Sequence, residues 1–328
     1  MFRKWILTVW LAGSLMGKLD AQDPEYSQFF ANPLTLNPAF AGTSELSRVI
    51  VNYRNQWPQK GATYTNYAIS YDDFFDRLNT GWGIQMSHDQ QLNQLIRISS
   101  ASFHYAYHIP VGDFSFLSAG LQAGLVYKQL DPSGLVFPSM INQLTGVVSG
   151  SLPANMEYAD LFYPDFAFGV VGQLREFFGG LSFHHLNQPS ESLLTGDQEG
   201  KLPLKLTLHV GGGIHRLHRE LLSREFTLSP NLIYQQQGPF KQLNTGMYMI
   251  EYPLLFGMWY RNNLSVKPDA LIFLLGIATG RFQLGYSFDY TLSKLSAYSY
   301  GSHEISLTFL FGQLIGMPNP RRLLIPPI

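Results

Sequence analysis

The sequence contains no cysteine. This absence excludes disulfide bonds, thiolate metal ligands, a cysteine nucleophile and a lipid-modified N-terminal cysteine. Charged residues are also scarce, at 14% of the 328 residues, against roughly 25% in soluble globular chains. The formal net charge is -1, so the composition gives no sign of a nucleic-acid-binding surface.

Long apolar runs are missing beyond the N-terminus. Residues 1–21 have the pattern of a signal peptide, because Arg3 and Lys4 precede an apolar run from Trp5 to Met16 and the segment closes at Ala21. A membrane anchor is the alternative, although this run is short for a bilayer span. No later stretch approaches a spanning helix, so membrane insertion would require a closed barrel.

What the sequence has instead is alternation of apolar and polar residues. In the stretch RFQLGYSFDYT (residues 281–291), every second side chain from Phe282 to Tyr290 is apolar or aromatic, and those between are polar or glycine. Successive side chains of a strand point to opposite faces. A soluble sandwich and a membrane barrel both show this pattern. Aromatic residues at the ends of the apolar row favour the barrel, since they collect at the lipid headgroup level.

The same alternation predicts an all-β transmembrane antiparallel barrel of about 14 strands within residues 47–312, since about ten residues cross the bilayer in each strand. Residues 313–328 then form a C-terminal tail. The expected strands are Arg48–Trp57, Tyr64–Tyr71, Trp82–Ser87, Leu95–His108, Phe116–Tyr127, Asp165–Gln173, Phe177–Leu186, Leu204–Ile214, Phe226–Tyr234, Gln242–Ile250, Leu254–Arg261, Leu271–Ala278, Phe282–Thr291 and His303–Phe311. The longest connections fall on one side, which is expected to face outward.

Residues 22–46 precede the first strand and contain two Asn-Pro pairs, Asn32-Pro33 and Asn37-Pro38. Proline excludes regular helix interior and central strand, so an ordered, turned segment is expected. Its aromatic residues, among them Tyr26, need burial. The segment is therefore interpreted as a docking element or lumen plug at the base of the barrel, or as a packed N-terminal strap.

The sequence offers little catalytic or metal-binding chemistry. Ser87, His88 and Asp89 are neighbours in an expected strand, so they point to alternate faces and cannot act as a hydrolase triad. No metal site and no cofactor is expected. The charged residues Arg54, Arg261, Asp289 and Glu304 share the lumen side, where either structural ion pairs or a conduction path would account for them.

Six stretches point to a known family: DPEYSQFFANPLTLNPAFAG, VNYRNQWP, SFHHLNQP, MWYR, GYSFDYTLSKL and HEISL, in order from Asp23 to Leu307. On these, the chain resembles the PorP/SprF family of outer-membrane proteins of the type IX secretion and gliding machinery. The resemblance implies an outer-membrane barrel without catalytic activity. It also implies partners, namely the periplasmic lipoprotein ring of the translocon and surface proteins that carry sorting domains.

Partner contact is expected in the N-terminal segment and in the stretch from Asn52 to Pro58. The candidate contact residues are Tyr26, Gln28, Asn32, Pro33, Asn37, Pro38, Asn52, Arg54 and Trp57. Three alternatives remain open at this point: a diffusion channel for small solutes, an outer-membrane lipase or protease, and a soluble sandwich.

Overall fold

The computed structural model describes residues 23–44, 46–58, 63–112, 115–131, 133, 136, 140–142, 144–148, 159–191, 200–215, 227–264, 267–292 and 300–312. The expected signal peptide (residues 1–21) and C-terminal tail (residues 313–328) lie outside this part of the chain. Its helices are single short turns, and none of those described is long and apolar enough to cross a membrane.

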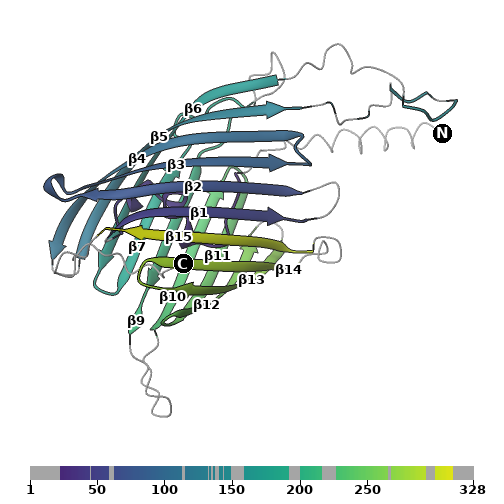
Figure 1. The fold of residues 1–328 in the computed structure, drawn as a ribbon. Coiled ribbons are helices and arrows are strands. Elements are labelled where there is room, and N and C mark those ends of the chain that lie inside the picture. The colour runs from purple at the N-terminus through teal and green to yellow at the C-terminus, as the bar shows by residue number, and fades with distance from the viewer. Residues whose placement is uncertain are drawn as a thin grey trace, which may run out of the picture.

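Fifteen strands form one antiparallel sheet that closes on itself (Figure 1). They are β1 (Ser47–Gln56), β2 (Tyr64–Phe75), β3 (Thr80–Gln91), β4 (Ile96–Gly112), β5 (Ser115–Leu130), β6 (Ala159–Leu174), β7 (Phe177–His184), β8 (Lys205–Gly212), β9 (Ile214–His215), β10 (Thr227–Gln237), β11 (Phe240–Glu251), β12 (Leu254–Asn263), β13 (Lys267–Ala278), β14 (Phe282–Thr291) and β15 (Ser302–Phe311). Strand β1 pairs with β15, and β10 pairs with β11, so the described sheet has no open seam.

Strands β8 and β9 both pair with β10 and are separated by the single residue Gly213. Counted as one interrupted strand, they reduce the fifteen strands of the sheet to fourteen wall strands. The predicted fold class is confirmed, and each of the fourteen expected strands has its counterpart. Most strands of the structure are longer than expected. The longest are β4 with 17 residues and β5 and β6 with 16 each.

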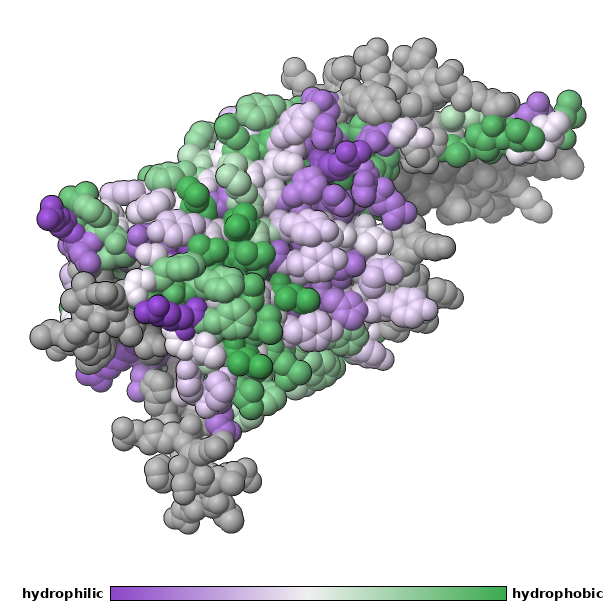
Figure 2. Space-filling view, in the orientation of Figure 1, coloured by the Kyte–Doolittle hydropathy of each residue, from purple (hydrophilic) through white to green (hydrophobic). Residues whose placement is uncertain are grey.

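The two faces of the wall differ as the alternation predicts. In β14 the outward Tyr286 and Tyr290 are 40% and 52% exposed, whereas the inward Ser287 and Asp289 are buried. Figure 2 shows a band of apolar side chains running across the outer wall, with polar side chains towards the strand ends. Such a band faces the hydrocarbon core of a membrane.

Most of the long connections lie at one end of the barrel. One end, the loop end, carries the long connections between β5 and β6, β7 and β8, and β14 and β15. The other, the turn end, carries short ones such as Arg175–Glu176 and Tyr252–Pro253, with residues 216–226 between β9 and β10 as a long exception, and there β1 begins and β15 ends. In outer-membrane barrels long loops face outward and short turns face the periplasm.

The outer band generates a first prediction. Phe273 lies on the outer face in the middle of β13, opposite Phe288, and is 46% exposed. Replacing Phe273 with Arg puts a charge near the bilayer midplane and should lower the free energy of unfolding in lipid vesicles by about 2–4 kcal/mol. The matched control is Leu254→Arg at the turn end, which should cost at most about 1 kcal/mol. Equal losses in denaturant titrations would contradict this placement of the membrane.

Candidate functional site

The interior of the barrel is occupied by the chain's own N-terminal segment, residues 23–43, called the plug below. It consists of the 3₁₀ helices η1 (Phe29–Ala31) and η2 (Pro38–Phe40) with one helical turn, α2 (Pro33–Leu36), between them. Pro33 and Pro38 each stand at the start of a turn, where no N–H is needed. The Asn37 side chain accepts a hydrogen bond of 2.9 Å from the Ala39 N–H. The two Asn-Pro pairs thus produce the predicted ordered turns.

The plug runs along the lumen from one end to the other. Asp23 contacts Lys205 and Gln237, which lie at the loop end of β8 and β10. Gly42 donates a 3.0 Å hydrogen bond to Asp72, close to the turn end of β2. The segment therefore lies inside the barrel over its length, whereas the sequence placed it at the base.

Aromatic side chains of the plug form an apolar core with the inner face of the wall. The ring centroids of Phe29 and Trp259 are 4.8 Å apart, and those of Phe30 and Phe178 are 5.5 Å apart. Ile272 and Leu274 of β13 also point inward and are buried in this cluster. Sequence reasoning missed this core, although the run LIFLLGIA, which is apolar at both parities, signals a strand covered on both faces.

Glycines of the wall leave room for the plug backbone. A Cβ at Gly120 would lie 2.4 Å from the Ala39 nitrogen, and one at Gly81 would lie 1.9 Å from the Ala41 oxygen. A Cβ at Gly169 would lie 2.0 Å from the Asn37 side chain. Because real side chains do not approach backbone this closely, the plug backbone requires glycine at positions 81 and 120, and Gly169 leaves room for the Asn37 side chain.

The four predicted lumen charges meet around Ser27 of the plug. Arg54 lies 2.9 Å from Asp289 and 3.0 Å from Glu304, and Arg261 lies 3.0 Å from Asp289. The Ser27 hydroxyl donates to Asp289 at 2.6 Å, and its N–H donates to Glu304 at 2.7 Å. All four charged side chains are at least nine-tenths buried. Two positive and two negative groups therefore balance in the interior while holding the plug.

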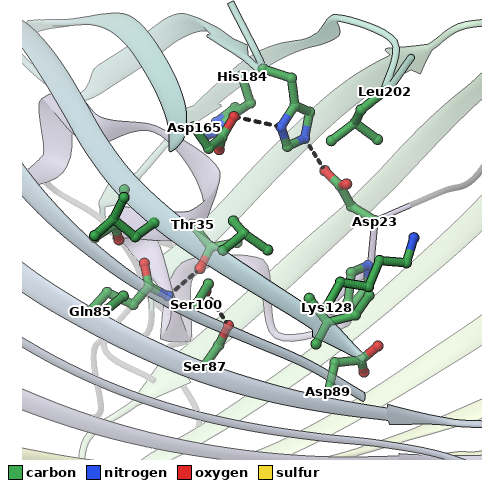
Figure 3. Close-up of a pocket in the computed structure, with 18 of the residues that line it drawn as sticks. Asp23, Thr35, Gln85, Ser87, Asp89, Ser100, Lys128, Asp165, His184 and Leu202 are labelled. Carbon is green, nitrogen blue, oxygen red and sulfur yellow. Dashed lines mark hydrogen bonds and ion pairs between the residues drawn. The ribbon is translucent and has the colours of Figure 1, made fainter. Parts of the chain in front are cut away.

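A second charged cluster, missed by sequence reasoning, joins the plug to the connection after β7 (Figure 3). The two ring nitrogens of His185 lie 2.9 Å from Asp23 and 2.9 Å from Asp165. Burial disfavours the charged ring, but the two carboxylates outweigh it and raise the pKa of His185 to about 10. Burial likewise acts to raise the pKa of Asp23, yet the charges of His185 and Lys205 hold it well below its usual value.

The same connection is also tied to the inner wall by Glu191. Its carboxylate lies 2.9 Å from the Lys128 ammonium group and accepts a short hydrogen bond from the Tyr163 hydroxyl. Lys128 and Tyr163 point into the lumen from β5 and β6. Residues 185–191, the first part of this connection, are therefore held at the loop end by His185 and Glu191.

Most of the other residues predicted to contact partner proteins are buried in the lumen. Tyr26 donates a short hydrogen bond to Asn66, Asn52 donates to the Ala31 carbonyl at 3.3 Å, and both are buried. Gln28 and Asn32 are buried in the lumen as well. Trp57 lies outside the plug, at the loop end, with its ring 5.6 Å from that of Tyr64. Contact of these residues with partner proteins stays a prediction.

Ser87, His88 and Asp89 hydrogen-bond to three different residues. Ser87 bonds Ser100, the outward His88 bonds Ser99, and Asp89 accepts from Gln91. Among the described residues no three His, Asp or Glu side chains come close enough together to hold a metal ion.

The family model for the type IX secretion system membrane protein PorP/SprF matches residues 18–309. The chain belongs to the PorP/SprF family. This PorP/SprF chain is an outer-membrane barrel and a membrane component of the type IX secretion system. No curated protein sequence matches it.

Solved outer-membrane barrels are similar to this PorP/SprF chain only distantly. Omp33 of Acinetobacter baumannii is 7% identical with a TM-score of 0.46, over 82% of this chain and 100% of Omp33. The CymD monoaromatic hydrocarbon channel is 12% identical with a TM-score of 0.46, over 87% of this chain and 94% of CymD. BamA of Haemophilus ducreyi lacking POTRA domains 1-3 is 11% identical with a TM-score of 0.42, over 81% and 70%. The assignment of this PorP/SprF chain as a barrel therefore comes from its own strand pairing.

The glycine contacts predict that the wall and the plug are matched in shape. Replacing Gly120 with Ala should lower the free energy of unfolding by about 1–3 kcal/mol, because the plug backbone must shift. Gly172→Ala is the control, since the nearest atom to its Cβ would be 3.7 Å away. Denaturant titrations in vesicles measure both. A loss shared equally by the two variants would rule out the plug contact as its cause.

The buried ion cluster predicts a large effect of removing one charge. Arg54→Gln leaves Asp289 and Glu304 with a single cation, and breaking such a buried pair costs about 3–5 kcal/mol. The control is Arg97→Gln, which removes a partly exposed pair with Asp131; such pairs contribute about 1 kcal/mol or less. Unfolding free energies that fall by similar amounts in both variants would show that Arg54 does not organise the interior.

Proposed function

We propose that this chain is a non-enzymatic accessory of type IX secretion that aids the export or surface attachment of client proteins and contacts the periplasmic lipoproteins of the machinery. The observation that carries the proposal is the filled lumen. Phe29, Phe30 and Phe40 of the plug lie in an apolar core with side chains of the wall, and a solute pathway requires a wet, polar lumen. The barrel then acts through its two ends.

The two ends suit different partners. The turn end faces the periplasm under the loop-length rule, so the lipoproteins are assigned to it. The loop end faces outward, so client proteins are assigned to that end, where Trp57 lies. The predicted contacts through Tyr26, Gln28, Asn32 and Asn37 require the plug to leave the lumen, because these side chains are buried there.

Deleting the gene tests the proposal directly. Mass spectrometry of surface and secreted proteins should show the loss of one or a few sorting-domain proteins, restored by a plasmid copy. The tagged protein should also copurify with the periplasmic lipoproteins. An unchanged set of surface and secreted proteins, together with no lipoprotein recovered, would refute the proposal.

The alternative is a diffusion channel for small solutes. Two cavities of about 250 and 470 Å³ lie beside Asp23 and Pro24 at the loop end, which is the observation in its favour. If the plug seals the lumen, the full chain should not conduct in planar bilayers, and deletion of residues 24–40 should create a conductance. The deleted variant must first show the gel mobility of a folded barrel. Conductance by the intact chain, with altered solute uptake in the deletion strain, would favour the channel.

A further inference from the structure

All but one of the buried carboxylates among the described residues have a cationic partner. Each has a cationic group within 3.0 Å, except Asp89. The pairs are Asp72 with Arg48, Asp165 with His185, Asp289 with Arg54 and Arg261, and Glu304 with Arg54. Asp89 is 4% exposed and forms no ion pair in the described part of the chain. When it is ionised, its negative charge is therefore not balanced by an ion pair among the described residues.

The carboxylate of Asp89 keeps free capacity to accept hydrogen bonds. The Gln91 side chain donates to one oxygen at 2.6 Å, and the Asn66 side chain lies 3.5 Å from the other. An ionised carboxylate offers about four acceptor positions. Burial of such a group without a cation is costly, so a positively charged ligand at this position would relieve the cost.

Asp89 also lies close to the loop end of the barrel, beside two cavities. It is the third residue from the loop end of β3, and it lines both cavities beside the N-terminal end of the plug. Figure 3 shows its carboxylate at the smaller cavity with no ion pair drawn to it. The larger cavity, about 470 Å³, is also lined by Trp57, Tyr64 and Gln56, and this volume is within the range of ligand sites, about 300–1,000 Å³. Arg54 and Arg261 line it too, but their charges are paired with Asp289 and Glu304.

We propose that Asp89 and the cavities around it bind an organic cation, the ammonium or guanidinium group of a lysine or arginine side chain that enters from the loop end. Such a group supplies the missing charge and several N–H donors, and charged hydrogen bonds of this kind are the strong ones. Trp57 and Tyr64 offer aromatic faces on which a guanidinium group stacks. Asn66 and Gln91 provide amide groups for the neighbouring main chain. The inference does not depend on the proposed role in secretion.

The test uses the full-length barrel in detergent and calorimetric titration with the peptide Gly-Gly-Arg-Gly-Gly. The same peptide with neutral citrulline in place of arginine is the ligand control. Asp89→Asn keeps the shape and removes the charge, and it should weaken arginine-peptide binding by about tenfold or more. Asp160→Asn is the matched variant, because Asp160 is an exposed carboxylate of β6 that bonds Tyr127 outside the cavities.

The Asn variant should remain folded, because asparagine has nearly the same size and places no charge in the interior. Heat-modifiable gel mobility and thermal unfolding verify this. Tighter binding of the peptide than of free agmatine would support a polypeptide as the source of the cation, and equal binding would support a free amine at the same site. No binding by the wild type, equal binding by wild type and Asp89→Asn, or displacement of the peptide by Ca²⁺ or Mg²⁺ would each overturn the proposal.

Discussion

The packing of the plug against the inner wall is the interaction on which the rest of the structure depends. Trp259, Tyr248 and Leu274 point into the lumen and are buried, which is the reverse of the polar interior usual for an outer-membrane barrel. Without the plug, these side chains would face water. The inner wall is therefore complementary to the plug: it has large apolar side chains on one part of its surface and glycines where the plug backbone approaches most closely.

Because the plug fills the lumen, charged side chains inside the barrel are removed from water. Charges removed from water remain ionised only when they are paired and hydrogen-bonded. Arg54 and Arg261 balance Asp289 and Glu304 around Ser27, and Lys205 and His185 join Asp23 at the loop end. Both clusters include a residue of the plug, Ser27 in one and Asp23 in the other, so each cluster also holds the plug to the wall. The unpaired Asp89 is an exception within this scheme, and it lies where the packing gives way to cavities.

The sequence was informative where the physical signal is periodic and local. Alternation predicted fourteen strands and their faces, because a strand turns every second side chain inward, and the Asn-Pro pairs predicted an ordered, turned N-terminal segment. The path of that segment could not be predicted from the sequence, since it depends on which part of the folded barrel wall the aromatic residues pack against. Contacts such as Gly120 with Ala39 join residues far apart in the chain. His185 was likewise unpredictable, because Asp23 and Asp165 reach it only after the barrel closes.

One of the two stretches that carry the family resemblance most specifically, Asp23 to Gly42, is almost the whole of the plug. Its Asn-Pro turns fix the path past Gly120 and Gly169, and its Ser27 completes the ion cluster. These residues thus have a structural reason for their identity that needs no partner protein. Withdrawing the plug would expose Trp259 and leave Arg54 and Glu304 without Ser27, so a gate that opens by its removal would break two clusters at once. Partner contacts at the loops and turns would leave both clusters intact, whereas contacts inside the lumen would not.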